Sequence, residues 1–487
     1  MSFPFLSIIV FSPVVGALII AALPKEKHLA IKLVAVVSAF ISMVLSIYVF
    51  FDYDQAAGGM QFEEQIRWIP SLGISYHLGT DGISLPLLLL TGIIIFCGVL
   101  ISWEKDVRPK EFFAFLLILV AGVFGVFVSL DLFLLFVFYE LAVLPMYLLI
   151  GGWGWPVTRE YAAMKLTLYL LVGSSIALIG ILAIYFEAGL GTFDIMTLSQ
   201  VGFTPLFQYL FFLPIFVGFG VLAGLWPLHT WSPDGHVAAP TAVSMLHAGV
   251  LMKMGAYSAL RVGIFILPIG AQKWLPWIVV LTVVNVVYGS MVAFAQKDFK
   301  YVIGYSSVSH MGYVAMGLAS MTVIGISGAS LQMFSHGIMT GLFFAVVGLI
   351  YRRTHTRQIP ELGGLARKMP FVAITFIIGG MASMGMPGLS GFVAEFQVLA
   401  GTWQAYPAIA AISLIGIVIT AAYIIKVSYK VFFGSLKSEY EGISAVSTIE
   451  KVALFIMAAL LIIVGLYPSI LLDVINTGVV PIMMRLR

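Results

Sequence analysis

Long apolar runs recur along the whole chain, each close to the length of a helix that crosses a bilayer. The run from Phe3 to Leu23 contains no charged residue, and its length favours a membrane span over a cleavable signal. Hydrophobic residues make up 61% of the 487 positions and charged residues only 10%, too little to cover the surface of a water-soluble protein of this size. The sequence therefore predicts an all-α polytopic membrane protein embedded in a lipid bilayer.

We count about 14 transmembrane helices when about 20 apolar residues are allowed for each one. The expected spans lie near residues 3–23, 29–51, 82–102, 112–130, 131–150, 161–184, 206–225, 241–262, 275–296, 301–320, 324–350, 370–400, 405–430 and 450–473. They group into N-terminal spans (1–111), a first five-helix repeat (112–262), a second five-helix repeat (275–430), and a C-terminal span with its tail (450–487).

Prolines and glycines interrupt spans 7 and 12. The stretch LWPLHTWSPDGH (225–236) follows span 7, and GMPGLSGFVAEF (385–396) lies within span 12, where Pro387, Gly388 and Gly391 should break or loosen the helix. Irregular backbone at membrane depth is tolerated only where it lines a cavity or is buried in protein. Two interrupted helices five spans apart predict two inverted repeats, spans 4–8 and 9–13, an arrangement typical of transporters.

Basic residues are distributed unequally between the two sides of the predicted bundle. If the N-terminus is outside, the outside segments hold only Arg67, Arg261, Lys273, Arg485 and Arg487, and nearly all other lysines and arginines fall inside. Positive charge concentrates on the cytoplasmic side of membrane proteins. The bias predicts that both termini lie on the outer face and that, in a bacterial cell, the inner (plasma) membrane holds the chain.

Three ionisable residues lie deep within predicted spans. Lys253 is near the middle of span 8, Glu140 is near the middle of span 5, and Glu395 follows the interruption of span 12. A charge at the centre of a bilayer costs at least about 2.5 kcal/mol to insert, so such residues are usually functional or paired. Two interpretations follow: a proton relay through these groups, or a static ion pair that holds helices together.

Two histidines, His310 and His336, lie at a similar depth in spans 10 and 11. Imidazole accepts and donates protons near neutral pH. The alternatives are a histidine hydrogen-bonded to a neighbouring helix and a bis-histidine haem, although nothing else in the sequence asks for a haem. Because all these titratable groups share one depth, we favour a polar row across the bilayer plane.

The stretch 225–236 is itself dense in polar groups. His229, Asp234 and His236 could supply three metal ligands, but no fourth ligand is evident, so we predict no metal site. His229 and His236 are instead candidate proton carriers at the inside mouth of a path, or caps for backbone groups that the prolines free. Lys165 lies near the inside end of span 6, where a lysine side chain reaches water.

The composition also argues against several function classes. Cys97 is the only cysteine, so an intrachain disulfide and a cysteine-ligated iron–sulfur cluster are excluded. No glycine-rich phosphate-binding turn follows a strand-like run. A net charge of +3 does not suggest a nucleic acid partner. We therefore expect no cofactor in this chain, with any redox chemistry on another one.

Four segments together resemble the antiporter-like subunits of respiratory complex I, the proton-pumping NADH:quinone oxidoreductase, and in particular its M subunit (chain 4 in mitochondria). They are residues 131–154, 227–261, 298–313 and 387–396, within a resemblance that covers about residues 80–430. The family fold has 14 transmembrane helices with two inverted five-helix repeats. The M type is indicated by Glu395, where L and N types usually have lysine, and by the absence of a long lateral helix before the end at Arg487.

The resemblance implies proton movement along a central hydrophilic axis. Its carriers would be Glu140, Lys253, His310, His336 and Glu395, with Lys165, His229 and His236 as further candidates. One position departs from the family, which usually has a lysine seven residues before His229, where this chain has Leu222. Three interpretations follow: Lys165 replaces that lysine as the partner of Glu140, water bridges the gap, or the uptake half-channel is altered or inactive.

The expected function is that of a proton-translocating subunit that couples electron transfer in other subunits to proton movement. The chain would then belong to an enzyme only through its complex, with L-type and N-type antiporter-like chains and small membrane subunits as partners. Two alternatives stay open at this point. One is a subunit of a multi-subunit sodium/proton antiporter or membrane-bound hydrogenase, and the other is a stand-alone secondary transporter.

Overall fold

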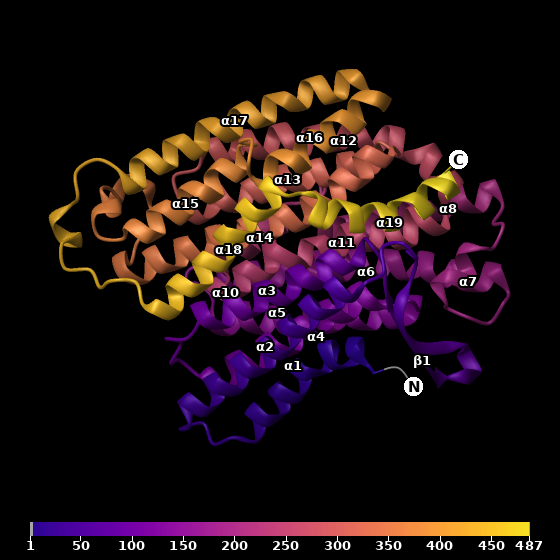
Figure 1. Ribbon diagram of the computed structural model, residues 1–487, viewed down its shortest axis with the longest axis horizontal. Coiled ribbons are helices and arrows are strands. Elements are labelled where there is room, and N and C mark those ends of the chain that lie inside the picture. The colour runs from indigo at the N-terminus through magenta and orange to yellow at the C-terminus, as the bar shows by residue number, and fades with distance from the viewer. Residues whose placement is uncertain (1–2, 487) are drawn as a thin grey trace.

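Helices dominate the computed structural model of the protein, which describes residues 3–486 (Figure 1). Within this range, 12 helices are at least 18 residues long and apolar enough to cross a membrane. Inside a bilayer no water satisfies backbone N–H and C=O groups, so apolar runs of this length must form helices. The predicted all-α membrane fold is confirmed, whereas the count of 14 spans stays a prediction.

Long helices alternate with short helical turns, and one hairpin of two strands lies between the second and third helices. In chain order, the elements are α1 (Phe5–Ala22), α2 (His28–Asp52), β1 (Gln61–Ile69), η1 (Pro70–Leu72), β2 (Ile74–Thr80), α3 (Ser84–Ile101), α4 (Pro109–Val128), α5 (Leu132–Trp153), α6 (Arg159–Ala188), α7 (Ile195–Ser199), α8 (Pro205–Ala223), α9 (Trp231–Ala238), α10 (Thr241–Leu246), η2 (His247–Leu251), α11 (Met252–Ser258), η3 (Ala259–Ile264), α12 (Pro268–Ala295), α13 (Phe299–Ala319), α14 (Val323–Thr354), η4 (Ile359–Glu361), η5 (Leu365–Arg367), α15 (Pro370–Ser383), α16 (Ser390–Ala405), α17 (Pro407–Phe432), η6 (Ser438–Tyr440), α18 (Thr448–Leu466) and α19 (Ser469–Leu486).

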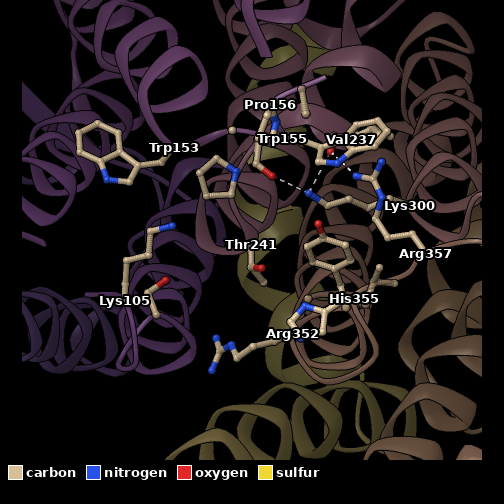
Figure 2. Close-up of a pocket in the computed structure, with 18 of the residues that line it drawn as sticks. Lys105, Trp153, Trp155, Pro156, Val237, Thr241, Lys300, Arg352, His355 and Arg357 are labelled. Atoms are coloured by element: carbon tan, nitrogen blue, oxygen red, sulfur yellow. Dashed lines mark hydrogen bonds between the residues drawn. The ribbon is translucent and has the colours of Figure 1, made fainter. Parts of the chain in front are cut away.

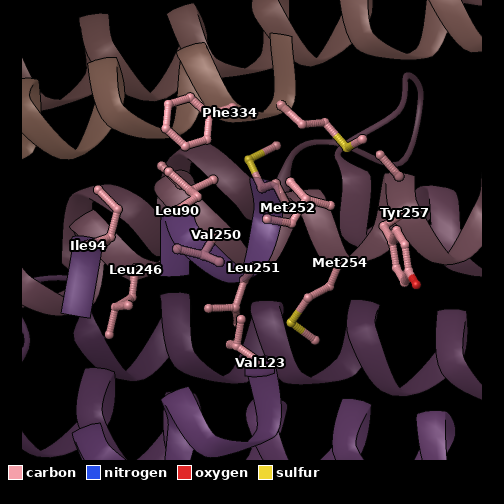
Figure 3. Packing of buried hydrophobic residues seen from close by; sticks show 14 of the residues in the cluster. Leu90, Ile94, Val123, Leu246, Val250, Leu251, Met252, Met254, Tyr257 and Phe334 are labelled. Atoms are coloured by element: carbon pink, nitrogen blue, oxygen red, sulfur yellow. The ribbon is translucent and has the colours of Figure 1, made fainter. Parts of the chain in front are cut away.

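Span 8 departs from the single regular helix expected over 241–262. It contains two π-helical turns, η2 and η3, with the short helix α11 between them. This span is buried from Ala242 onward, and Figure 3 shows its side chain Leu246 beside Ile94 of α3 and its side chain Leu251 beside Val123 of α4. A π turn leaves irregular carbonyl positions in the middle of a helix and is frequent at functional sites. No apolar pattern in the sequence signals it.

The two predicted interruptions are present, with local corrections. Span 7 ends at α8 and is followed by the separate short helix α9, and span 12 is divided into α15 and α16. The break in span 12 contains Gly385 (φ 69°) and Gly388 (φ 92°), both in the left-handed region that favours glycine. Gly391, which was expected to help break the helix, instead lies inside α16, where an added Cβ would clash with the Ala382 carbonyl of α15. Its role is to let the two halves approach.

Each of the two predicted repeats contains a similar isolated β-bridge. Asp131 forms an isolated antiparallel bridge with Asp194, and Asp298 forms one with Gln358. Each of the two bridging residues Asp131 and Asp298 also accepts hydrogen bonds from backbone N–H groups of the helix that follows it, α5 or α13. This correspondence is what related repeats would produce, while the inverted relation itself stays a prediction.

The C-terminal segment differs from the expected single span at 450–473 with its tail. Helix α18 ends at Leu466 and a second helix, α19, begins after Pro468, so the predicted span 450–473 belongs to two helices. Both helices pack along α14, and Figure 1 shows them one after the other rather than side by side. Proline lacks the N–H that would continue α18, which explains the break.

Both ends of the described chain lie at the same end of the bundle (Figure 1). The Leu6 N–H donates to the Glu64 carboxylate of β1 at 2.8 Å, and the Arg485 guanidinium donates to the Phe265 carbonyl at 2.9 Å. The antiparallel hairpin β1–β2, which fills the loop between α2 and α3, was not expected from the sequence. Which face of a membrane this end occupies stays a prediction.

An imidazole between two carboxylates ties this hairpin to the segment before α7. His77 Nδ1 lies 2.8 Å from Asp194 Oδ2 and His77 Nε2 lies 3.1 Å from Glu63 Oε2. Burial alone would lower the pKa of His77, but the hydrogen bonds and charges of Asp194 and Glu63 raise it above its usual value. The protonated histidine is therefore stabilised in the folded protein.

The first prediction concerns the close approach at Gly391. We expect Gly391→Ala to lower the free energy of unfolding by about 1–3 kcal/mol, because the methyl group forces α15 and α16 apart. Unfolding of the purified chain by sodium dodecyl sulfate in mixed micelles measures this. Gly151→Ala is the matched control, because nothing lies within 4 Å of the added methyl group in α5. Equal stability of the two variants would contradict the tight packing.

The second prediction is a pH dependence. Because the folded-state pKa of His77 is raised, its contribution to stability is complete below the unfolded pKa of about 6.5 and is lost as pH rises through the folded pKa. Thermal unfolding of the detergent-solubilised chain should therefore show wild type losing its advantage over His77→Gln as pH increases above about 6.5. His28→Gln, at an exposed histidine, should leave the pH profile unchanged. A His77→Gln profile parallel to wild type would refute the proposed linkage.

Candidate functional site

Four buried titratable side chains lie in a row across the central helices. Lys253 of α11, His336 of α14, His310 of α13 and Glu395 of α16 are each at most 2% exposed. Lys253 Nζ lies 2.8 Å from His336 Nδ1, and His310 Nδ1 lies 3.0 Å from Glu395 Oε1. The structure thus brings together four of the five residues that were predicted to form the polar row.

Lys253 owes its position to the π turn η2. Its ammonium donates to the Ala248 carbonyl within that turn as well as approaching His336. The irregular turn thereby contributes a backbone acceptor to the buried ammonium group. An ammonium against one imidazole nitrogen forms a pair in which a single proton can reside on either partner.

His310 is held by both halves of the divided span 12. Its Nε2 lies 3.0 Å from Ser383 Oγ at the end of α15, and its Nδ1 faces Glu395 of α16. Gln332 of α14 donates to Glu395 Oε1 at 3.3 Å. The sequence reasoning missed Ser383 and Gln332. The signal for Gln332 was its spacing of four residues from His336, which places both on one face of a helix.

The two halves of the row meet at the two histidines. The ring centroids of His310 and His336 are 5.3 Å apart, and no direct hydrogen bond joins them. His336 Nε2 and the second carboxylate oxygen of Glu395 are buried without a hydrogen-bond partner among the described residues. Transfer between the two rings therefore needs rotation of a ring or a bridging water.

Glu140 stands apart from this row. It is half-buried in α5, and its Oε1 has no hydrogen-bond partner in residues 3–486. The interpretation that Lys165 replaces the family's lysine is wrong, because Lys165 Nζ binds Asp234 at 2.8 Å instead. Leu222 is fully buried in the apolar core of α8.

The polar stretch 225–236 does not form a metal site in the structure. Asp234 binds Lys165, His236 Nε2 lies 2.9 Å from Ser232 Oγ, and His229 packs edge-on against the Tyr288 ring. The three candidate ligands thus point to different partners. No group of three histidine, cysteine or acidic side chains that could hold a metal occurs within residues 3–486.

His247 forms a further imidazole contact that the sequence reasoning missed. The rings of His236 and His247 are 4.2 Å apart, and both residues are fully buried. Neither ring nitrogen of His247 has a partner among the described residues, nor has Nδ1 of His236. Buried imidazole nitrogens are normally hydrogen-bonded, so three free ones mark a place where a mobile proton or water could bind.

Comparison with known proteins agrees with this architecture. A family profile described as "NADH:quinone oxidoreductase/Mrp antiporter, TM" matches residues 129–420. NADH-quinone oxidoreductase subunit M of Rhodobacter capsulatus is 40% identical, over 97% of this chain and 95% of that relative. NAD(P)H-quinone oxidoreductase chain 4 of Gloeobacter violaceus is 38% identical, over 97% of this chain and 91% of that relative.

The fold is also shared with a solved structure. A chain of respiratory complex I from Thermus thermophilus with bound NADH has a TM-score of 0.91 and 29% sequence identity, and the match covers 99% of this chain and 100% of that one. Because the family profile spans more than half of the chain and the relatives align with nearly all of it, the chain belongs to the antiporter-like M-type (chain 4) subunits of NADH:quinone oxidoreductase, respiratory complex I.

Proposed function

We propose that this chain moves protons along the buried row from Lys253 to Glu395, driven by electron transfer in other subunits of the complex. The observation that carries this proposal is the contact of two proton-sharing pairs, Lys253–His336 and His310–Glu395, through two histidine rings 5.3 Å apart. Each pair can hold a proton on either member, so a proton that arrives at one pair displaces one toward the next.

A static ion pair accounts less well for the same contacts. Buried polar groups that serve structure alone are normally fully hydrogen-bonded. Here His336 Nε2, at the junction of the two pairs, and Glu395 Oε2, at the far end of the row, have no partner in the described residues. These free positions are where a relay would receive and release protons.

The uptake side of the path is proposed to use imidazoles. Since Lys165 is held by Asp234 and position 222 is a leucine, Glu140 has no cation within 4 Å among the described residues. His247, in the inside half of span 8, and His236, in the neighbouring helix α9, have buried ring nitrogens without a hydrogen-bond partner among the described residues. Glu140 and His229 remain candidate proton carriers, without a contact to the row.

The setting of this activity is also a proposal. We place the chain in a bacterial inner membrane with both termini on the outer face, beside L-type and N-type antiporter-like chains and small membrane subunits. The flavin, iron–sulfur and quinone chemistry would lie in other subunits, with no cofactor in this one. The concentration of basic residues at the opposite end of the bundle from the termini supports this orientation.

The third prediction tests the row at its fully buried lysine. Lys253→Met should reduce proton pumping and the coupled quinone reduction at least about tenfold, because a thioether of similar length cannot carry a proton. Both rates are measured with the intact complex in proteoliposomes, using NADH as donor and a pH-sensitive dye. Lys426→Met is the control, since Lys426 donates to the Phe294 carbonyl outside the row.

Assembly must be shown separately, by the yield of intact complex and by NADH oxidation with an artificial electron acceptor. Normal pumping in assembled Lys253→Met complex would overturn the relay. If Lys426→Met lost pumping to the same degree, the loss in Lys253→Met would not be specific to the buried row.

The fourth prediction concerns uptake. His247→Gln keeps a polar side chain of similar size but cannot be protonated, so pumping should fall about tenfold or more if this imidazole carries protons. The same proteoliposome measurement serves, with the exposed His28→Gln as control. Unchanged pumping would show that His247 is only a packing residue against the Trp231 ring, on which it stacks.

A further inference from the structure

A cavity of about 400 Å³ opens at the basic end of the bundle, away from the polar row (Figure 2). Its walls are the loop before α4, the turn after α5, the joint between α9 and α10, the start of α13 and the end of α14. Four lysine and arginine side chains line it together with His355, whereas Glu104 is the one acid among the lining residues. The lysines and arginines are Lys105, Lys300, Arg352 and Arg357.

The two arginines of the cavity are already neutralised. Arg352 binds Glu104 and Glu450, each at 2.8 Å. Arg357 lies 3.2 Å from Asp298 and stacks over the Trp155 ring at 4.0 Å. These side chains build the walls and leave little unbalanced charge.

The two lysines have no such partner. No carboxylate of residues 3–486 lies within 4 Å of the ammonium group of Lys105 or of Lys300. Lys300 is buried and donates to the carbonyls of Val237 (3.3 Å) and Ala239 (2.6 Å), which uses two of its three N–H groups. Figure 2 shows Lys105 and Lys300 extending toward the space beside Thr241 from opposite sides.

Unpaired positive charge at this place is unfavourable. Burial and the charges of Arg352 and Arg108 lower the pKa of Lys105. Removing an ammonium group from water without a counter-ion costs free energy, which a bound anion between the two lysines would recover. The cavity is far larger than one water molecule and has room for a tetrahedral anion with attached groups.

We propose that this cavity binds a phosphate group, with Lys105 and Lys300 contacting its oxygens from opposite sides. The same chemistry is offered by the headgroup of an anionic phospholipid and by a soluble phosphate. Trp153 and Trp155 in the cavity wall are typical of residues at the membrane–water interface, and basic pockets between membrane helices bind anionic headgroups. The site does not depend on the proposed proton row.

The fifth prediction is a binding measurement on the purified full chain in a neutral detergent. Native mass spectrometry follows a titration with phosphatidylglycerol, and phosphatidylcholine of the same acyl chains serves as the reference lipid. We expect preferential binding of phosphatidylglycerol, weakened about tenfold by Lys105→Gln, because one charge-assisted hydrogen bond is lost. Lys27→Gln, at an exposed lysine that does not line the cavity, should bind like wild type.

A second arm identifies the source of the phosphate. Calorimetric titration of the same proteins with inorganic phosphate should show Lys105-dependent binding if the ligand is soluble, and no heat if the acyl chains are required. Lys105 makes no side-chain hydrogen bond among the described residues, and its ammonium lies 5.6 Å from the centre of the Phe112 ring, so the fold of Lys105→Gln is checked by its unfolding temperature. Lys300→Gln, checked by its unfolding temperature, should weaken binding at least as much.

The proposal is overturned if neither phosphatidylglycerol nor inorganic phosphate distinguishes Lys105→Gln from Lys27→Gln. The cavity would then be a water-filled vestibule. Because these measurements record binding rather than pumping, failure of the proton row would leave them unaffected.

Discussion

The interaction on which the rest of the structure depends is the pairing of buried titratable side chains inside the helix bundle. A bilayer supplies neither counter-ions nor water, so a charged side chain at its centre must find partners within the protein. Lys253 contacts an imidazole nitrogen of His336, and Glu395 contacts one of His310, on helices that are distant in sequence. Apolar helices packed in lipid have little to fix their relative positions, whereas these polar contacts set the register of α11, α13, α14 and α16.

The irregular backbone and the polar row depend on each other. The Ala248 carbonyl, which lies within the π turn η2, accepts a hydrogen bond from the ammonium of Lys253. The break between α15 and α16 places Ser383 and Glu395 on two sides of one imidazole, which an unbroken helix could not do. The close approach at Gly391 keeps the two halves together despite the break. Irregular segments at this depth are therefore part of the site.

The sequence predicted those parts of the structure that follow from solvation. Apolar length predicted the helices, and the cost of burying charge singled out Lys253, Glu140 and Glu395, of which Glu140 lies apart from the row. The depth of His310 and His336 in their spans added the two histidines. It could not predict contacts that depend on three-dimensional register. The π turns leave no compositional mark, and Gln332 and His247 are ordinary polar residues until neighbouring helices bring them against His310 and His236. The count of spans predicted that Lys165 lies near the inside end of span 6. Only the structure shows that its ammonium binds Asp234.

Because position 222 is a leucine, the two predicted repeats of this chain differ in their buried titratable groups. Leu222 is fully buried in α8, and Gly255 of α11 packs directly against the α8 backbone at this point. A lysine there would have to displace packed side chains as well as lose its hydration, and both effects are unfavourable. Within residues 3–486, Glu140 therefore has no cation within 4 Å, whereas the row from Lys253 to Glu395 contains two contacting pairs that approach each other at the His310 and His336 rings. In the proposed function, proton movement depends on the row that begins at Lys253 and on the group that protonates this lysine. The free imidazole nitrogens of His236 and His247 are the groups in the structure whose chemistry fits that step.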